Sequence, residues 1–119
     1  MRSVADPMPS SLPVLRGNLD VLVLKALTWR PMHGYEITDW LERSGGGTLD
    51  LVDSALYQAL YRLEARRLIK AEWGASANNR RARFYELTPA GRAFLKAETI
   101  NWQRYAEAVN AILTATRPA

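Results

Sequence analysis

The C-terminal part of this 119-residue sequence is one long amphipathic segment. Thr88 and Pro89 are a typical helix start, with Thr88 as the N-cap and Pro89 at the first helical position. From Pro89 to about Thr114 the helix would contain roughly 26 residues and measure about 39 Å at 1.5 Å per residue. A domain of this size does not need so long a helix. The segment therefore predicts that residues 89–116 pack against a second subunit.

An apolar seam runs along this predicted helix. Its members recur at intervals of seven residues, which is the spacing of a short heptad repeat. Glu98 also occupies a seam position, so we expect irregular packing rather than a regular coiled coil. The seam predicts a homodimer interface that contains Leu95, Trp102, Tyr105, Val109 and Ile112.

Apolar residues at helical spacing predict three shorter helices upstream. The first runs from 19 to about 28, with Asn18 as its N-cap. The second runs from 33 to about 43 and ends at a serine followed by three glycines. The third runs from 54 to about 67, with Asp53 as its N-cap. The second and third helices together resemble a helix-turn-helix with a long turn.

A β-hairpin is predicted between the third helix and the long one. Residues 68–73 and 83–87 alternate between apolar and polar side chains, as strands do. The predicted tip, 74–82, is polar and rich in asparagine and arginine. The fold class is therefore mainly α with a small β-hairpin: a winged helix-turn-helix over 15–88, followed by a dimerisation helix over 89–116.

The remaining features exclude several classes of protein. Residues 1–14 are rich in proline and serine and lack the apolar run of a secretory signal, so they predict a flexible arm in a cytoplasmic protein. No apolar stretch approaches the roughly 20 residues of a membrane span. The sequence has no cysteine and one histidine, which leaves no nucleophile pair or metal set for an enzyme. We expect no cofactor, no metal and no catalytic residue.

Positive charge is concentrated in the middle of the chain. The stretch 54–92 contains eight basic and three acidic side chains, a net charge of +5, whereas the whole chain carries +4. Such a local excess is typical of proteins that bind nucleic acid. It predicts that the helix-turn-helix and the hairpin share a surface for double-stranded DNA.

The candidate DNA-contact residues follow from their places on these elements. An α-helix fits the major groove, where Gln58 can pair with adenine and Arg62 with guanine or a phosphate. Hydroxyl groups on the same helix can donate to phosphate oxygens. Arginines of the hairpin can follow the backbone or enter a narrow minor groove. The predicted contacts from the third helix and the hairpin are Ser54, Tyr57, Gln58, Tyr61, Arg62, Asn79, Arg80, Arg81 and Arg83.

Several short motifs, in this order, resemble the PadR family of transcriptional regulators. They are RGNLD at 16–20, HGYEI at 33–37, LYQALYRLE at 56–64, LI at 68–69, RFYELT at 83–88 and AGR at 90–92. Each motif is moderately specific, and their combination is highly specific. The resemblance extends from about Leu15 to Leu113.

The resemblance implies a homodimeric winged helix that represses promoters at inverted-repeat operators. It also implies that Tyr35 and Tyr57 lie at the DNA backbone. Two positions depart from the family pattern: Ala55 replaces a common serine or threonine, and Gln58 replaces a common proline. The first puts one phosphate contact in doubt, and the second could add a base contact.

Two alternatives concern ligands and partners. In some relatives a tryptophan on the dimer helix lines a cavity for flat hydrophobic compounds, and Trp102 with Tyr105 could do the same. The alternative for both residues is a packed dimer core. The winged helix could also serve as a protein-interaction module without DNA readout, because a fold does not fix a function. The concentrated basic charge argues against that alternative.

Overall fold

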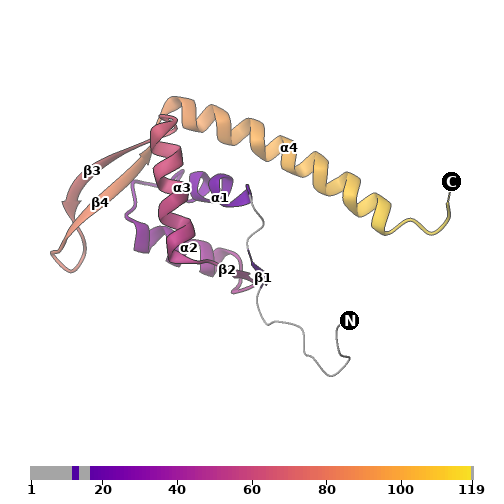
Figure 1. The fold of residues 1–119 in the computed structure, drawn as a ribbon, viewed down its shortest axis with the longest axis horizontal. Coiled ribbons are helices and arrows are strands. Elements are labelled where there is room, and N and C mark those ends of the chain that lie inside the picture. The colour runs from indigo at the N-terminus through magenta and orange to yellow at the C-terminus, as the bar shows by residue number, and fades with distance from the viewer. Residues whose placement is uncertain (1–11, 14–16, 119) are drawn as a thin grey trace, which may run out of the picture.

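The computed structural model describes residues 12–13 and 17–118 (Figure 1). Among these, four helices and two small sheets follow in the order β1 (Leu12–Pro13), α1 (Asn18–Ala26), α2 (Gly34–Ser44), β2 (Leu49–Asp50), α3 (Asp53–Ala65), β3 (Ile69–Ala75), β4 (Arg81–Leu87) and α4 (Pro89–Leu113). The predicted fold class, mainly α with a β-hairpin and a long last helix, is confirmed. Residues 1–11 and 14 of the predicted flexible arm lie outside the described residues.

Helix α1 is the centre of the apolar core. It contacts each of the other three helices, and Val23, Leu24 and Leu27 are buried almost completely. Helix α3 contributes Leu60 and Leu63 to the same cluster. Burying one aliphatic side chain of this size stabilises the fold by about 1.5–3 kcal/mol. The core therefore fixes the position of α3 against α1.

The helix starts differ in part from the predicted ones. Helix α2 begins with a capping box: Nδ1 of His33 accepts from the Glu36 N–H, and the Glu36 carboxylate accepts from the His33 N–H, both at 3.3 Å. Asn18 and Asp53 were predicted as N-caps, and both predictions are wrong. Each is the first helical residue, and Gly17 and Val52 precede them without a side-chain cap.

Helix α3 ends in a tight turn that leads directly into the hairpin. Arg67 adopts a left-handed conformation, with φ of 59°. The Leu68 N–H donates to the Leu63 carbonyl and the Arg67 N–H to the Glu64 carbonyl, which is the Schellman pattern. This turn brings β3 back alongside α3.

The hairpin is longer and its tip shorter than predicted. Antiparallel pairing extends from Ile69 opposite Leu87 to Ala75 opposite Arg81. The turn is closed by bonds between Ser76 and Arg80 and between Asn79 and Ser76, each 2.8 Å long. Arg81 falls in the predicted tip but lies on strand β4, whereas Arg83 lies on this strand as predicted. The outer part of the strand lacked an alternating pattern because small and basic residues replace apolar ones there.

A short parallel pair was not predicted. Strand β1 pairs with β2 in the connection between α2 and α3. Strand β1 falls in the segment predicted as an arm, and β2 falls between the predicted second and third helices. Two-residue strands have no periodicity, so the sequence carried no signal for them.

The start of α4 is held against the hairpin. The Thr88 hydroxyl accepts from the Gly91 N–H at 3.0 Å and donates to the Arg67 carbonyl at 2.8 Å, which confirms Thr88 as the N-cap. Gly91 lies against the Leu68 carbonyl so closely that a Cβ atom there would be 2.0 Å from its oxygen. The first turns of α4 therefore belong to the core of the winged helix.

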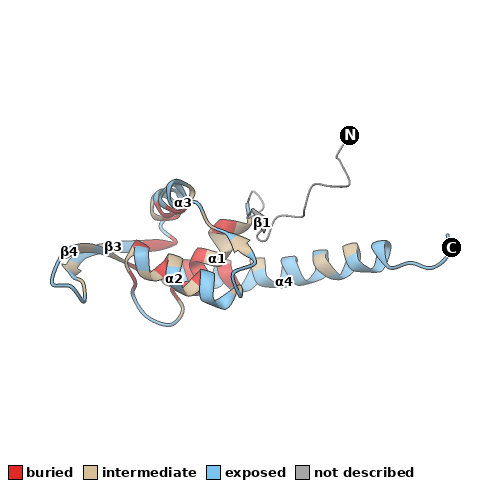
Figure 2. Ribbon diagram, turned by 90° about the horizontal axis from the view of Figure 1, so that it is seen from below, coloured by how far each residue is buried: buried red, intermediate tan, exposed pale blue. Residues whose placement is uncertain are grey.

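Most of α4 extends away from this core. Leu95 is 7% exposed and lies in the core of its own subunit, so its assignment to the dimer seam is corrected. Beyond it, almost every residue of the helix is exposed (Figure 2). Large apolar side chains on this part include Trp102, Tyr105, Ile112 and Leu113.

Candidate nucleic-acid interface

Helix α3 presents a polar face opposite its buried one. Ser54, Gln58 and Tyr61 lie at helical spacing on the side away from Leu56 and Leu60. All three polar residues are exposed, and Tyr61 is 77% exposed. This face offers hydroxyl and amide groups, which are suited to phosphate oxygens and base edges.

Two tyrosines mark the junction of α2 and α3. Tyr35, in the first turn of α2, is 78% exposed. Tyr57 lies across Gly34, where a Cβ atom would be 2.8 Å from the Tyr57 hydroxyl oxygen. The absence of a side chain at Gly34 therefore lets Tyr57 pack at the N-terminus of α2. Both hydroxyl groups are at the same end of the helix pair.

Arg62 lies on the flank of α3 and contacts α1. Its Nη2 donates to Oδ1 of Asp20 at 2.7 Å, although the two residues are 42 positions apart in the sequence. The carboxylate raises the pKa of Arg62 above the ordinary value, chiefly through this hydrogen bond. The side chain keeps 51% of its surface exposed. Arg62 therefore connects two helices and is less available for a base than predicted.

Arg83 occupies the equivalent place on the other flank. Its Nη2 donates to Oε2 of Glu64 at 2.7 Å, which joins strand β4 to α3. The guanidinium also lies near the ring of Tyr85, 5.9 Å from its centre. Burial raises the pKa of the Tyr85 phenol above its ordinary value. Ion pairs thus hold α3 on both flanks.

The remaining predicted contacts lie at the end of the hairpin. Asn79 adopts a left-handed turn conformation with φ of 57°, which asparagine tolerates well. Arg80 is exposed and has no ion pair within the described part of the chain. Arg81 places its guanidinium carbon 4.6 Å from the ring centre of Trp73. The predicted cluster of tip cations is therefore distributed between the tip and the strand.

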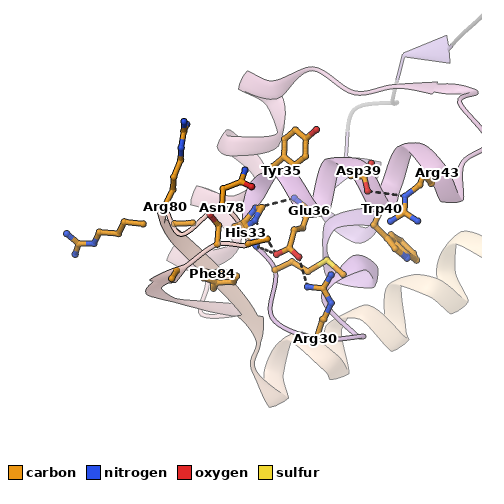
Figure 3. A pocket seen from close by; sticks show the side chains of 16 residues that line it. Arg30, His33, Tyr35, Glu36, Asp39, Trp40, Arg43, Asn78, Arg80 and Phe84 are labelled. Carbon is orange, nitrogen blue, oxygen red and sulfur yellow. Dashed lines mark hydrogen bonds and ion pairs between the residues drawn. The ribbon is translucent and has the colours of Figure 1, made fainter.

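An open groove of about 670 Å³ separates α2 from the hairpin (Figure 3). Its acidic residues are neutralised by arginines on the same side: Glu36 accepts from Arg30 at 2.8 Å, and Asp39 accepts from Arg43 at 3.0 Å. Figure 3 shows Arg80 extending away from the hairpin at the rim of this groove. With both carboxylates paired, Arg80 and Arg81 of the hairpin leave the groove with excess positive charge.

The apolar residues of distal α4 lie apart from this surface. The rings of Trp102 and Tyr105 are 6.1 Å apart, at an interplanar angle of 37°. Trp102 is 47% exposed and Val109 is half-buried. These two residues share one face of α4 with Tyr105 and Ile112, as the heptad spacing predicts.

Neither a metal site nor a membrane span is found among the described residues. No group of three or more His, Cys, Asp or Glu side chains lies close enough to bind a metal ion there. In the same part of the chain, no helix combines the length and apolar character needed to cross a membrane.

Helix-turn-helix, basic hairpin and long last helix define the winged helix-turn-helix class of proteins. The model of the PadR-like family of transcriptional regulators matches residues 23–97. The chain belongs to this family, whose members are transcriptional regulators and not enzymes.

Solved structures agree with this assignment. A PadR family regulator from Clostridium difficile is 28% identical with a TM-score of 0.72, covering 82% of this chain and 99% of that one. A PadR family regulator from Eggerthella lenta is 27% identical with a TM-score of 0.72, covering 85% and 86%. An uncharacterised protein X of Lysinibacillus sphaericus is 25% identical over 82% of this chain and 89% of its own length.

The pairing of the arginines predicts unequal effects on DNA binding. Arg80→Ala should lower the salt slope of duplex binding by about one unit, because one phosphate contact releases about 0.9 counterions. Arg62→Ala should change the slope by less, because Asp20 already compensates its charge. Affinity measured against salt concentration on random duplex DNA tests this difference. A larger slope change for Arg62→Ala than for Arg80→Ala would contradict it.

Proposed function

We propose that the protein is a sequence-specific DNA-binding regulator that represses transcription as a homodimer at inverted-repeat operators in the cytoplasm. The observation that carries the proposal is the exposed polar face of α3, which lies beside an arginine-bearing hairpin. Helix α3 would enter the major groove, and the hairpin would follow the backbone into the adjacent minor groove. The concentrated positive charge favours DNA over a protein partner.

The site residues divide by their chemistry. Gln58 is the candidate for a base contact, because its amide can pair bidentately with adenine. Tyr35, Ser54, Tyr57 and Tyr61 would donate to phosphate oxygens. Arg80 and Arg81 would neutralise backbone charge, with Asn79 forming the turn between the strands. Arg62 and Arg83 would bind DNA through the guanidinium N–H groups that do not donate to their carboxylate partners.

The homodimer would form through the distal half of α4. The helix exposes Trp102, Tyr105, Ile112 and Leu113 to solvent in the single chain. A large exposed apolar surface on a helix marks an interaction site. A second copy is the natural occupant, since two such helices can bury the seam against each other. The symmetry of the dimer would match a two-fold operator.

A charge placed on this seam should dissociate the dimer. Ile112→Glu is expected to give a folded monomer, because Ile112 is 74% exposed and contributes nothing to the core. Ala111→Glu is the matched control: it adds the same charge one residue away, about 100° around α4 from Ile112 and outside the seam. Sedimentation at micromolar concentration should show a monomer for Ile112→Glu and a dimer for the control. Identical oligomeric states in the two variants would overturn the assignment of the seam.

A change at Gln58 should alter which sequences are bound. Selection from a random duplex library with the wild-type protein should return a two-fold symmetric site. Gln58→Ala should relax the preference at one position of each half-site, at a cost of about 1–3 kcal/mol against the correct base. An equal loss on selected and random DNA would reduce Gln58 to a backbone contact. If the wild-type library yields no enriched sequence, the sequence-specific function is wrong.

The effector of the regulator would be a planar hydrophobic compound between the α4 helices. Trp102 and Tyr105 supply two neighbouring aromatic rings, both exposed in the single chain. Such rings stack on flat ligands. The alternative, in which both rings only fill the dimer core, makes a different prediction.

A titration distinguishes the two roles of Trp102. Planar aromatic compounds should quench tryptophan fluorescence in a saturable way if a ligand binds. The same titration on Trp102→Phe is the control, because Trp29, Trp40 and Trp73 also emit. Quenching that persists unchanged in Trp102→Phe, or the absence of saturable quenching by any compound tried, would leave the residue as dimer packing alone.

A further inference from the structure

Trp73 is an exposed tryptophan on the hairpin. Tryptophan is usually well buried, because its large apolar surface is costly to leave in water. Trp73 nevertheless keeps 61% of its surface exposed. Packing in the core therefore does not explain its position.

The strand register places Trp73 on the side of the hairpin that faces α3. Side chains alternate along β3 and β4, so Ile69 and Trp73 share one face with Arg83 and Leu87. The base of this face is buried in the core at Ile69 and Leu87. Further out, Arg83 on the same face binds Glu64 of α3. Trp73 lies opposite Arg83 and therefore belongs to the exposed end of the surface between hairpin and α3.

Arg81 lies on the same face and stacks on Trp73. Its guanidinium carbon is 4.6 Å from the indole ring centre, within the range of a cation–π interaction. The stack restricts a long flexible side chain while leaving the N–H donors at the edge of the guanidinium accessible. A cation with a fixed orientation beside a flat apolar ring is suited to a ligand that has both an anionic and an apolar part.

We propose that Trp73 and Arg81 form one composite contact for the DNA backbone, with the guanidinium on a phosphate and the indole against the adjoining deoxyribose. The inference rests on the proposed DNA-binding function and adds a contact residue to it. In a winged helix bound to DNA, the strand between major and minor groove passes between the recognition helix and the hairpin. The face that holds Trp73 and Arg81 borders this space.

The charge around the pair favours DNA over an acidic or apolar protein segment. Arg80 precedes the pair at the tip, and among the described residues neither Arg80 nor Arg81 forms an ion pair. An apolar protein partner would leave these two cations without compensation at a dry interface. A backbone with one phosphate at each step compensates them and presents a sugar between successive charges.

Substitutions of the two residues test the pair with a random-sequence duplex as the probe. Trp73→Leu should lower affinity about three- to tenfold and reduce the salt slope by about one unit, because Arg81 loses its orientation. Arg81→Ala should give a similar loss, and the double variant should lose little more than either single one. Trp73→Phe should retain most of the affinity, because a benzene ring still stacks on a guanidinium.

Trp29→Leu is the matched control. Trp29 is also exposed, at 60%, and also lies under a cation, with Nζ of Lys25 5.1 Å from its ring centre. It lies in the connection between α1 and α2, outside the face shared by α3 and the hairpin. Its replacement should leave DNA affinity and salt slope unchanged.

A second measurement does not depend on the loss of affinity. Duplex DNA should protect part of the tryptophan emission of the wild type from acrylamide, and the protected part should disappear in Trp73→Phe, which still binds. If Trp73→Leu binds like Trp29→Leu, or if the losses of Trp73→Leu and Arg81→Ala multiply, the composite contact is wrong while DNA binding stands. If the wild type does not bind the duplex at low salt, the proposed function fails as well.

Discussion

The apolar contact between α1 and α3 is the interaction on which the rest of the structure depends. Val23 and Leu24 of α1 and Leu60 and Leu63 of α3 are buried almost completely in the same cluster. A buried face of this kind fixes the orientation of α3 about its own axis, because rotating the helix would expose several aliphatic side chains to water. The opposite face, with Ser54, Gln58 and Tyr61, is thereby presented to solvent in one orientation. Figure 2 shows the buried residues of α1 and α3 gathered at this contact.

Two ion pairs also hold α3 in position, in addition to the apolar core. Asp20 binds Arg62 on one flank of α3, and Glu64 binds Arg83 on the other. Pairs that are partly exposed contribute modestly to stability, about 0.2–1 kcal/mol each. Their larger consequence is geometric, since they connect α3 to α1 and to the hairpin. Arg62 and Arg83 thus have a structural role near the proposed DNA surface. The hairpin tip and the Trp73–Arg81 pair are the proposed contacts for the DNA backbone.

Periodicity made most of the fold predictable. The apolar spacing of the helices, the glycines after α2 and the Thr88–Pro89 start each have a local cause, and each element was found near its predicted place. The motifs of the PadR family added the class of protein. The elements with no local signal were missed: the two-residue strands β1 and β2, and the outer parts of β3 and β4, where alternation is weak.

The site was less predictable because its geometry depends on distant residues. Asp20 and Arg62 are 42 positions apart, and Glu64 and Arg83 are 19 apart, so no spacing rule connects them. Leu95 fits the heptad spacing equally well as a seam or a core residue, and only the contact of α4 with its own domain decides between them. The exposure of Trp73 follows from the strand register. The residue type alone would have predicted a buried side chain.

The proposed homodimer would place two α3 helices in successive major grooves of one DNA duplex. Footprinting of the full-length protein on a duplex selected from a random library measures this directly. The expected result is two equivalent protected segments related by two-fold symmetry, with centres about 34 Å apart or a multiple of it. A single asymmetric protected segment, or uniform protection without defined edges, would contradict the claim.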